Sequence, residues 1–507
     1  GIEYEYETNY KGNSFPNSSV SLYRPDFYLP NYDIYIEHFG VDRNMRASFL
    51  SDERERHKYE SSMEWKRRVH KANRSVLIET YSFQCQDGNI FHKLKETLSS
   101  YNVQFKPIDC SEFYKKVYID GADRLFEEFT KLIRSFLSLY KANGSKLNAD
   151  PGSIRTKLFM RIFNNFFTYY EDCLHETNTI DFDDMIIRAT ALVSDMKFTY
   201  KQVMIDEYQD ISLSRYNLIN RLVDNTNANL FAVGDDWQSV FRFAGSDIKL
   251  FSKFEQNNIP CELFKLETTY RSPQGLLSMA GDFILRNKDQ IPKNLTSEKH
   301  RDKPIRLIIY NSGVEDKRIA FVKAVDMLVE EYGVNNSIMV LGRTKYDLEF
   351  MNDKSDKTFR LSYDRSREKH KIVYEKYPKL NMYYLTVHKA KGQEADNVII
   401  ANGECGLLGF PNEIEDDEML QLVLSEPDKF AFAEERRLFY VALTRTKNSV
   451  YILVPNQNPS CFIDDIICHP EVNLVPLDNV ERVDFNSSLK CPRCKKGNLV
   501  MRLNSKT

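Results

Sequence analysis

Short apolar runs that end in polar residues dominate the chain from about residue 200 onward. These runs are "VMIDEYQD", "LFAVGDDWQ", "FKLETTYRS", "IRLIIYN", "IMVLGRT", "YYLTVHKAKG", "NVIIANG" and "SVYILVP", and helical stretches separate them. Short runs of this kind are typical of strands buried on both faces, and their alternation with helices predicts parallel sheets. We therefore expect two such sheets that meet near residue 270, with functional residues at the carboxyl ends of the strands.

The pattern upstream of residue 200 differs. Residues 1–88 alternate strand-like segments with turns around a charged helical stretch from about Asp52 to Lys71, which predicts a small α/β unit. Residues 89–198 are helical, as in "ADRLFEEFTKLIRSFLSLYKA", and form a supporting subdomain. We assign 199–270 to the first parallel sheet, 271–477 to the second and 478–507 to a polar tail.

Composition limits the kind of protein. A length of 507 residues predicts three or four domains. With 70 basic and 73 acidic side chains, the net charge of −3 gives no overall attraction to nucleic acid or to membranes, so DNA binding requires a local groove. The chain lacks a long apolar run and begins without a signal-peptide pattern, so we expect a cytoplasmic protein without a membrane partner.

Two carboxylates close the first of these strands. Asp206 and Glu207 have the chemistry to hold Mg²⁺ and to prepare a water for attack on a phosphate, although the same dipeptide is common at surface turns. The next strand ends in a second acidic cluster that includes Gln238, an uncharged side chain able to orient a water or to sense a phosphate. Together the two strand ends favour a phosphate-handling site.

Aromatic and cationic residues follow these carboxylates. Phe241 and Phe243 flank Arg242, an arrangement that suits stacking on unpaired bases, although spacing alone fits two core rings as well. "LETTYRSP" then ends a third predicted strand with Tyr270 and Arg271. An arginine at that point has the chemistry to neutralise charge on a transferring phosphoryl group.

The order of these motifs resembles a known family. "IDFDDMI", "VMIDEYQD", "VGDDWQSVFRFAGSD", "LETTYRSP", "YYLTVHKAKGQEADNVII" and "EERRLFYVALTRTK" are similar to the successive motifs of UvrD/Rep-type superfamily 1 DNA helicases, over residues 180 to 447. The resemblance implies two RecA-like parallel-sheet motor domains, the first incomplete here. It also implies ATP and Mg²⁺ as cofactors, single-stranded and junction DNA as partners, and 3′ to 5′ movement in repair or recombination by a monomer.

The resemblance also implies roles at the nucleotide. Asp206 would hold Mg²⁺, and Glu207 would be the general base for the attacking water. Gln238 would couple the γ-phosphate to the DNA contacts. The ring of Tyr270 would stack on adenine, and Glu394 would lie near the ribose.

Further roles fall on the second motor domain and on the DNA path. Arg271 and Arg445 match the two arginines that contact the γ-phosphate from the second domain. Thr386, His388 and Lys391 belong to the segment that links ATP to the strand.

One departure concerns the DNA contacts. The family usually reads "YRWRGA" where this chain has "FRFAGS", so Phe243 replaces a tryptophan and Ala244 replaces an arginine. Phe241, Arg242 and Phe243 remain the expected contacts, with a smaller ring and one cation fewer.

The first 88 residues resemble a segment found in the helicase IV-like branch, and "YRPDFYLPNYDIYIEHFGVDR" looks like a PD-(D/E)xK nuclease core. Asp26 and Glu37 would share a metal there. Phe39 stands where that pattern expects a lysine, and Lys66 on the next helix is placed to supply the ammonium. The alternative is a decayed nuclease fold kept as a DNA-contacting or structural insert.

Three motifs differ from those of larger family members. Only about 35 residues separate "VLGRTKYD" from "YYLTVHKAKG", which predicts a minimal 2B insert. Cys491 and Cys494 form half of a zinc ribbon, so zinc is expected only with a longer C-terminus. No GxxxxGK[ST] phosphate loop occurs, and we expect it upstream of Gly1.

Three interpretations therefore remain open. The chain is an ATP-dependent helicase or translocase that lacks its phosphate loop, an ATPase-inactive DNA-binding chain, or a metal-dependent nuclease acting through Asp26, Glu37 and Lys66.

Overall fold

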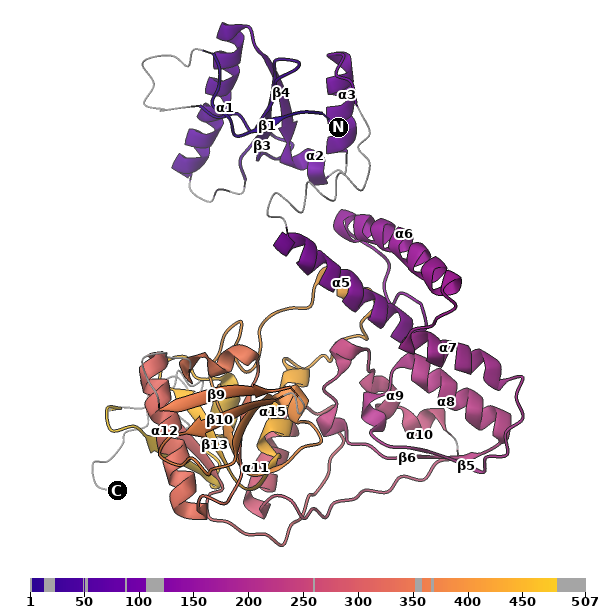
Figure 1. Cartoon of the computed structure of the whole chain (residues 1–507), viewed down its shortest axis with the longest axis vertical. Helices are drawn as coiled ribbons and strands as arrows, with labels where there is room; N and C mark the ends of the chain where they lie inside the picture. The colour runs from indigo at the N-terminus through magenta and orange to yellow at the C-terminus, as the bar shows by residue number, and fades with distance from the viewer. Residues whose placement is uncertain are drawn as a thin grey trace, which may run out of the picture. The chain divides into compact units, whose positions relative to one another are not determined.

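The computed structural model describes residues 2–12, 23–48, 50, 53–86, 89–105, 123–258, 260–351, 358–365 and 369–480. The chain divides into two compact units (Figure 1). Unit 1 comprises Gly1–Ile133 and Pro151–Phe166, and unit 2 comprises Arg134–Asp150 and the chain from Phe167 onward. In the part of the chain that is described, no helix combines the length and apolar character needed to cross a membrane.

Unit 1 contains a four-stranded sheet in the order β1 (Glu5–Tyr6), β2 (Phe27–Leu29), β3 (Ile34–Phe39) and β4 (Val76–Tyr81). The first three strands pair antiparallel, whereas β3 and β4 run parallel and are connected through α1 (Glu53–Asn73). Two further helices, α2 (Ser82–Gln86) and α3 (Ile90–Ser100), follow β4. The helix predicted near 52–71 is therefore present as α1.

Alternation along β3 sends its side chains to opposite faces of this sheet. Ile34 and Ile36 pack in one cluster with Leu98 of α3, and Phe39 packs in another with Met63 of α1. Figure 1 shows α1 and α3 on the two sides of the strands. Glu37 has the same parity as Phe39, so its carboxylate lies on the α1 side.

Long helices follow the four-stranded sheet along the chain. These are α5 (Asp123–Ala142), α6 (Ile154–Glu176) and α7 (Phe182–Val193), and the division between the units cuts through the first two. In unit 2, Lys141 near the end of α5 is almost fully buried and lies 2.7 Å from Glu171, 2.8 Å from Asp181 and 2.7 Å from Asp184. Asp181 also caps α7 through the backbone of Asp184. One ammonium therefore joins α5, α6 and the start of α7.

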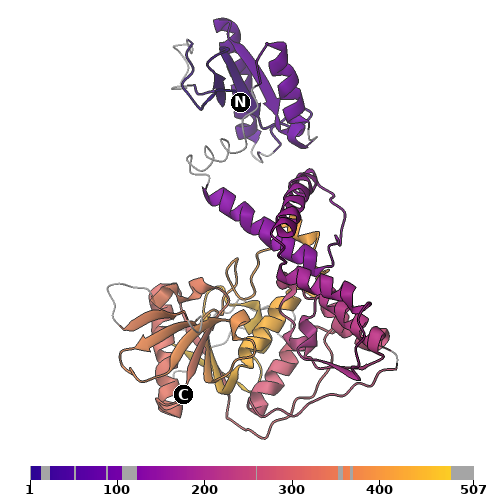
Figure 2. The same cartoon turned by 45° about the vertical axis from the view of Figure 1, so that its right-hand side comes forward.

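The larger sheet of unit 2 has eight strands in the order β14, β7, β13, β12, β8, β11, β10, β9. The first six in this order are parallel: β14 (Val472–Pro476), β7 (Ile305–Tyr310), β13 (Thr446–Pro455), β12 (Ala395–Ile400), β8 (Ile338–Gly342) and β11 (Met382–Thr386). On one side lies α12 (Gly313–Tyr332), and on the other lie α11 (Gln274–Ile284) and α15 (Ala433–Leu443) (Figures 1 and 2). The predicted second parallel sheet with covered faces is confirmed.

Shorter helices complete this part of unit 2. Their bounds are α13 (Val387–Ala390), α14 (Glu418–Gln421) and α16 (Cys461–Ile466). Between β8 and β11 the chain forms the 3-10 helix η4 (Lys345–Met351) and the antiparallel hairpin β9 (Phe359–Asp364) and β10 (Lys369–Tyr374). Because β10 also pairs with β11, this hairpin extends the sheet at the position of the predicted minimal 2B insert.

The smaller sheet of unit 2 pairs only β5 (Gln202–Ile205) with β6 (Asn229–Ala232), in parallel. Helices α8 (Leu213–Thr226), α9 (Ile248–Ser252) and α10 (Phe254–Asn257) accompany it. The expectation that both of its faces are covered is wrong within the described residues. Val203 and Ile205 pack in a core cluster, whereas Met204 and Phe231 on the other face are 67% and 59% exposed.

The predicted third strand, which was to end at Tyr270 and Arg271, is also wrong. Residues 261–267 belong to no strand. The next residue, Thr268, forms only an isolated bridge with Thr296. Phe264 and Leu266 are 80% and 85% exposed. A strand needs a hydrogen-bonded neighbour along its length, and the described residues supply one only at Thr268, so this apolar run forms no strand.

Candidate functional site

Asp206 and Glu207 lie where β5 ends, exposed to solvent. Asp206 accepts the backbone N–H of Glu207 at 2.9 Å, and Glu207 adopts a left-handed backbone conformation with φ of 51°. A non-glycine residue in that region carries strain of about 1 kcal/mol or more, which is found most often at functional sites. Both carboxylates therefore project from a sharply turned strand end.

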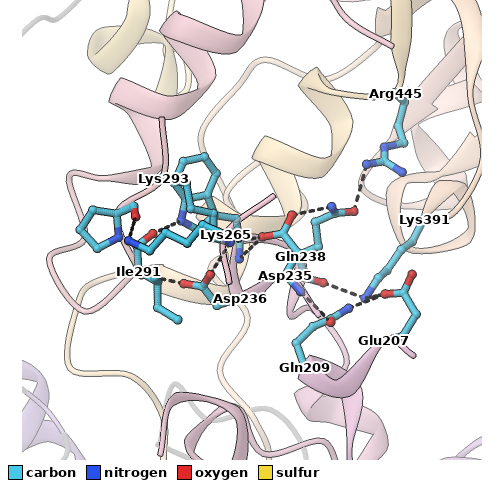
Figure 3. A network of polar contacts seen from close by, with 12 residues as sticks. Glu207, Gln209, Asp235, Asp236, Gln238, Lys265, Ile291, Lys293, Lys391 and Arg445 are labelled. Carbon is cyan, nitrogen blue, oxygen red and sulfur yellow. Dashed lines mark hydrogen bonds and ion pairs between the residues drawn. The ribbon is translucent and has the colours of Figure 1, made fainter. Parts of the chain in front are cut away.

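A buried glutamine links this strand end to the next one (Figure 3). Gln209 donates from Nε2 to Glu207 and accepts the backbone N–H of Asp235 at 2.9 Å. Asp235 follows β6, the strand that pairs in parallel with β5. The sequence had not singled out Gln209, although it stands inside the quoted run "VMIDEYQD".

Gln238 connects the smaller sheet to α15. Its Nε2 donates to Asp235 at 2.7 Å, while its Oε1 accepts from Nη2 of Arg445 at 3.0 Å. Arg445 is only 2% exposed, and it also donates from Nε to the carbonyl of Val441 at 3.1 Å. Burial, followed by repulsion from Arg271, lowers the pKa of Arg445 to about 10, so its guanidinium remains charged at neutral pH.

Lys391 makes a second connection across the same region. Its ammonium binds Asp210, lies 2.8 Å from the carbonyl of Gln238 and 3.9 Å from Glu207. The same ammonium lies 5.0 Å from the centre of the Phe241 ring. The structure therefore places Lys391 beside Glu207 and beside the ring of Phe241, a candidate DNA contact. The sequence had not indicated Asp210 as its partner.

The predicted nucleotide residues of the second half form their own group. Arg271 donates from Nε to Glu394 at 2.8 Å, and Lys447 lies 3.0 Å from the other carboxylate oxygen of Glu394. Hydrogen bonds from Arg271 and Lys447 lower the pKa of Glu394 to about 2, so this carboxylate is ionised at neutral pH. The ring of Tyr270, which precedes Arg271, is 78% exposed. Lys447 was not predicted.

The rings of Phe241, Phe243 and His388 contact one another and form a compact group, which we call the ring row. Phe243 lies 5.9 Å from Phe241 and 5.2 Å from His388, both in edge-to-face geometry. Phe243 is half exposed. Burial, and then repulsion from Arg343, lowers the pKa of His388 to about 4, so the imidazole is neutral at physiological pH and acts as an uncharged ring. This places the predicted stacking residues side by side.

Two other predicted DNA contacts have different surroundings. Arg242 donates to the carboxylate of Asp416 at 2.7 Å and to the carbonyl of Ser425 at 2.9 Å, so its charge is neutralised within the protein. Thr386 is the N-cap residue of α13. Nearby, Arg437 of α15 donates to the carbonyl of Ser239 at 2.6 Å, which adds a further link that the sequence did not reveal.

The predicted nuclease residues lie in unit 1 and meet at one point. Because Phe27 pairs with Ile36, Asp26 lies next to Glu37, and Asp26 accepts the N–H of His38 at 2.6 Å. Glu37 is 1% exposed and accepts from Lys66 at 2.6 Å and from Tyr23 at 2.7 Å. Both of its oxygens therefore already have a hydrogen-bond partner.

Metal-binding capacity differs between the expected sites. Within the described ranges, no group of three or more His, Cys, Asp or Glu side chains is arranged to hold a metal ion. Mg²⁺ in nucleotide sites needs only one or two carboxylates, because phosphates and waters supply its other ligands, so Asp206 and Glu207 fit that role. Cys491 and Cys494 lie outside the described residues.

A lysine from the second half of unit 2 organises the acidic cluster after β6. Lys293 lies 2.5 Å from Asp235 and 2.6 Å from Asp236, and its ammonium is 4.8 Å from the centre of the Trp237 ring. Asp236 is buried and also accepts the backbone N–H of Ile291 at 2.8 Å. Lys293 thus holds the carboxylate that accepts from Gln238 (Figure 3).

Replacing Lys293 with methionine is expected to lower the free energy of unfolding by about 3 kcal/mol, because Asp236 would keep a buried charge without its partner. Urea denaturation measures this loss. Lys249→Met is the matched control, since Lys249 pairs with the exposed Glu426 and should contribute far less. Adding Asp236→Asn to Lys293→Met should recover part of the loss, and a Lys293→Met protein as stable as the wild type would contradict the assignment.

Comparisons with known proteins match a segment in each half of the chain. Residues 43–258 match the family described as UvrD/REP helicase N-terminal domain, and residues 361–457 match the UvrD-like helicase C-terminal domain. The chain is 32% identical over 301 residues to DNA helicase IV of Escherichia coli (strain K12), which covers 58% of this chain and 40% of that protein. It is 30% identical over 164 residues to ATP-dependent DNA helicase PcrA of Bacillus subtilis (strain 168), covering 31% of this chain and 22% of that protein.

Proposed function

This chain belongs to the UvrD/Rep family of DNA helicases, and we propose that it forms the body of an ATP-dependent 3′ to 5′ helicase or translocase that acts on DNA in repair or recombination. The observation that carries this proposal is the double hydrogen bond of Gln238, to Asp235 and to Arg445. The uncharged side chain of Gln238 thereby links Asp235, which follows β6 beside the strand end that carries Asp206 and Glu207, to Arg445, which follows α15. Because these relatives extend well beyond the matched segments, the activity is proposed for the protein that contains this chain.

The carboxylates after β5 would handle the hydrolytic step. Asp206 would hold Mg²⁺, which when bound would neutralise charge on the phosphates of ATP. Glu207, held by Gln209, would accept a proton from the attacking water. The exposure of both carboxylates supports these roles, since each must meet a ligand from outside the chain.

The second half of unit 2 would contact the same nucleotide. Arg445 and Arg271 would neutralise charge on the γ-phosphate, and the exposed ring of Tyr270 would stack on adenine. Glu394 would receive the ribose, but it is paired with Arg271 and Lys447. Nucleotide binding would therefore require Arg271 to leave Glu394 and to bind the γ-phosphate. Binding of ATP would in this way change the position of the strand ends of the larger sheet relative to those of the smaller sheet.

Movement along DNA would follow from this rearrangement. Gln238 contacts Asp235 and Lys391 contacts Asp210, both at the ends of the smaller sheet. Phe241, Phe243 and His388 lie within a few residues of Gln238 or Lys391 along the chain. A change in the position of Gln238 or Lys391 would thus shift the ring row. Neutral stacking rings suit bases of any sequence, as a translocase requires.

A phosphate-binding loop is the missing component of this site. The 507 residues contain no GxxxxGK[ST], and one face of the β5–β6 pair exposes Met204 and Phe231. Parallel sheets are normally buried on both faces, so we propose that a segment carrying strand, phosphate loop and helix packs on this face.

The decisive test compares this chain with a version extended by its upstream coding sequence. The extended protein should hydrolyse ATP faster with single-stranded DNA than without it, whereas the chain alone should bind DNA and show no stimulated hydrolysis. A coupled ADP-release assay measures ATP hydrolysis by both proteins, with and without single-stranded DNA. If the extended protein hydrolyses ATP at the same rate with and without DNA, the motor proposal fails. Mg²⁺-dependent DNA cleavage that Asp26→Ala abolishes would instead support the nuclease interpretation.

A further inference from the structure

A pocket of about 290 Å³ opens between η4 and the β9–β10 hairpin, and we call it the hairpin pocket. Its walls are Tyr346, Tyr363 and His370, and the apolar side chains of Leu348 and Leu361 complete its lining. None of these residues belongs to the nucleotide group or to the ring row. The pocket is therefore a separate feature of the segment between β8 and β11, where a minimal 2B insert was predicted.

Its rings are arranged for stacking rather than for core packing. Tyr346 and Tyr363 are 50% and 51% exposed, although their neighbours Leu348 and Ile372 are buried. Tyr363 and His370 pair directly across the hairpin, with ring centroids 4.8 Å apart. A half-exposed ring beside an apolar lining offers one face to a flat ligand, which is the geometry in which aromatic side chains bind bases.

Charges around the pocket indicate which part of a nucleotide enters it. Lys345 lines the pocket, with its ammonium 5.2 Å from the centre of the Tyr346 ring, and the exposed Arg365 follows Tyr363 by two residues. Glu349 also lines the pocket. A carboxylate repels phosphate but accepts hydrogen bonds from base amino groups, so a base fits inside while the backbone follows the cations outside.

The hairpin pocket lies at the same sheet edge as the ring row. Strands β8 and β11 are parallel with Gly342 opposite Thr386, so Arg343–Tyr346 and Val387–Lys391 leave the sheet side by side. The charge of Arg343 reaches His388, and His370 pairs with Tyr384 of β11. A strand of DNA on the ring row therefore has the pocket next to it along this edge.

We propose that the hairpin pocket binds an unpaired base of single-stranded DNA and so extends the ring row across the second sheet, a role that rests on the proposed function. Tyr346 and Tyr363 stack on the base, and Lys345 contacts the adjoining phosphate. The hairpin thereby supplies a DNA contact at the position of the predicted minimal 2B insert.

Binding of the full chain to fluorescent oligothymidines of increasing length tests this proposal. Tyr363→Ala and Tyr346→Ala are each expected to weaken binding of the longer oligonucleotides about tenfold and to leave the shortest ones unchanged. Tyr363→Phe and Tyr346→Phe, which keep the ring, should bind within about twofold of the wild type. Phe243→Ala should weaken binding at every length.

A measurement on the wild-type chain avoids the risk that a variant misfolds. Photocrosslinking of an oligonucleotide containing 5-iodouracil should label Tyr346 or Tyr363, as mass spectrometry would show. Wild-type binding at every length by both alanine variants, together with crosslinks only to the ring row, would overturn this inference and leave the proposed function standing. Failure of the wild-type chain to bind single-stranded DNA would instead remove the proposed function itself.

Discussion

Replacing Arg445 with alanine is expected to lower kcat for DNA-stimulated ATP hydrolysis about 10³-fold in the protein extended to include a phosphate loop. Arg445 is buried and charged, and its Nη2 already reaches Gln238 at 3.0 Å. Its loss would remove positive charge from the γ-phosphate and would also release Gln238 from α15. We therefore expect kcat to fall much more than the KM for ATP rises, because the interaction is strongest in the transition state.

Two variants sharpen this test. Arg445→Lys keeps a charge but loses the planar fork that holds Val441 and Gln238, so it should remain strongly impaired. Arg286→Ala removes a half-exposed arginine that pairs with Asp465, away from this network, and should leave kcat unchanged. Steady-state kinetics with saturating single-stranded DNA would contradict the role of Arg445 if the alanine variant stayed within about tenfold of the wild type.

Replacing Lys141 with methionine is expected to lower the free energy of unfolding of this chain by about 3–5 kcal/mol. Lys141 faces Glu171, Asp181 and Asp184, and its removal would leave these carboxylates close together with no cation between them. Because Lys141 joins α5, α6 and α7, the loss should appear as earlier melting of these helices. Chemical denaturation followed by circular dichroism measures the change.

The dependence of this loss on pH has a definite sign. Burial acts to raise the pKa of Asp181, but hydrogen bonds from Lys141, Asp184 and Tyr170 bring it below its ordinary value. A carboxylate with a depressed folded pKa stabilises the protein above its unfolded pKa of about 4, and this stability is lost as pH falls through the folded value. In the Lys141→Met protein the clustered carboxylates would repel one another, which raises their folded pKa values. The difference between wild type and Lys141→Met should therefore be largest near neutral pH, begin to shrink above the ordinary carboxyl pKa of about 4, and be smallest below it.

Lys131→Met is the matched control on the same helix. Lys131 is exposed and pairs with the exposed Glu128, so its removal should change stability little at any pH. A Lys141→Met protein that unfolds together with this control would show that the buried cluster contributes nothing to stability.

Local patterns accounted for the strands β7, β8, β11, β12 and β13 of the larger sheet and for the helix α1, whereas β9, β10 and β14 were not predicted. Each of the runs "IRLIIYN", "IMVLGRT" and "NVIIANG" forms a strand where it was expected, because a buried parallel strand needs only a short apolar stretch and a polar end. The run "FKLETTYRS" has the same pattern and forms no strand. Whether such a run becomes a strand depends on a neighbouring strand from elsewhere in the chain, and the sequence of the run itself does not show whether that neighbour is present.

The motifs and their order identified most residues of the candidate site. Only the folded structure showed which residues pair with its charged side chains. Asp206, Glu207, Gln238 and Arg445 stood in recognisable motifs. Lys293 stands in the unremarkable run "QIPKNLTS", more than 50 residues from the carboxylates it binds. Arg242 was expected to contact DNA, yet its guanidinium meets Asp416.

The amino-acid sequence alone was enough to identify the α/β class, the two parallel sheets, the family and the residue types that could act on a phosphate. These properties follow from periodicity and from short motifs, which are local. The link from Glu207 through Gln209, Asp235 and Gln238 to Arg445, and the hairpin pocket, emerged only with the folded chain. Hydrogen bonds and stacking act over a few ångströms, so residues far apart in sequence acquire them only when folding brings their strand ends to one edge.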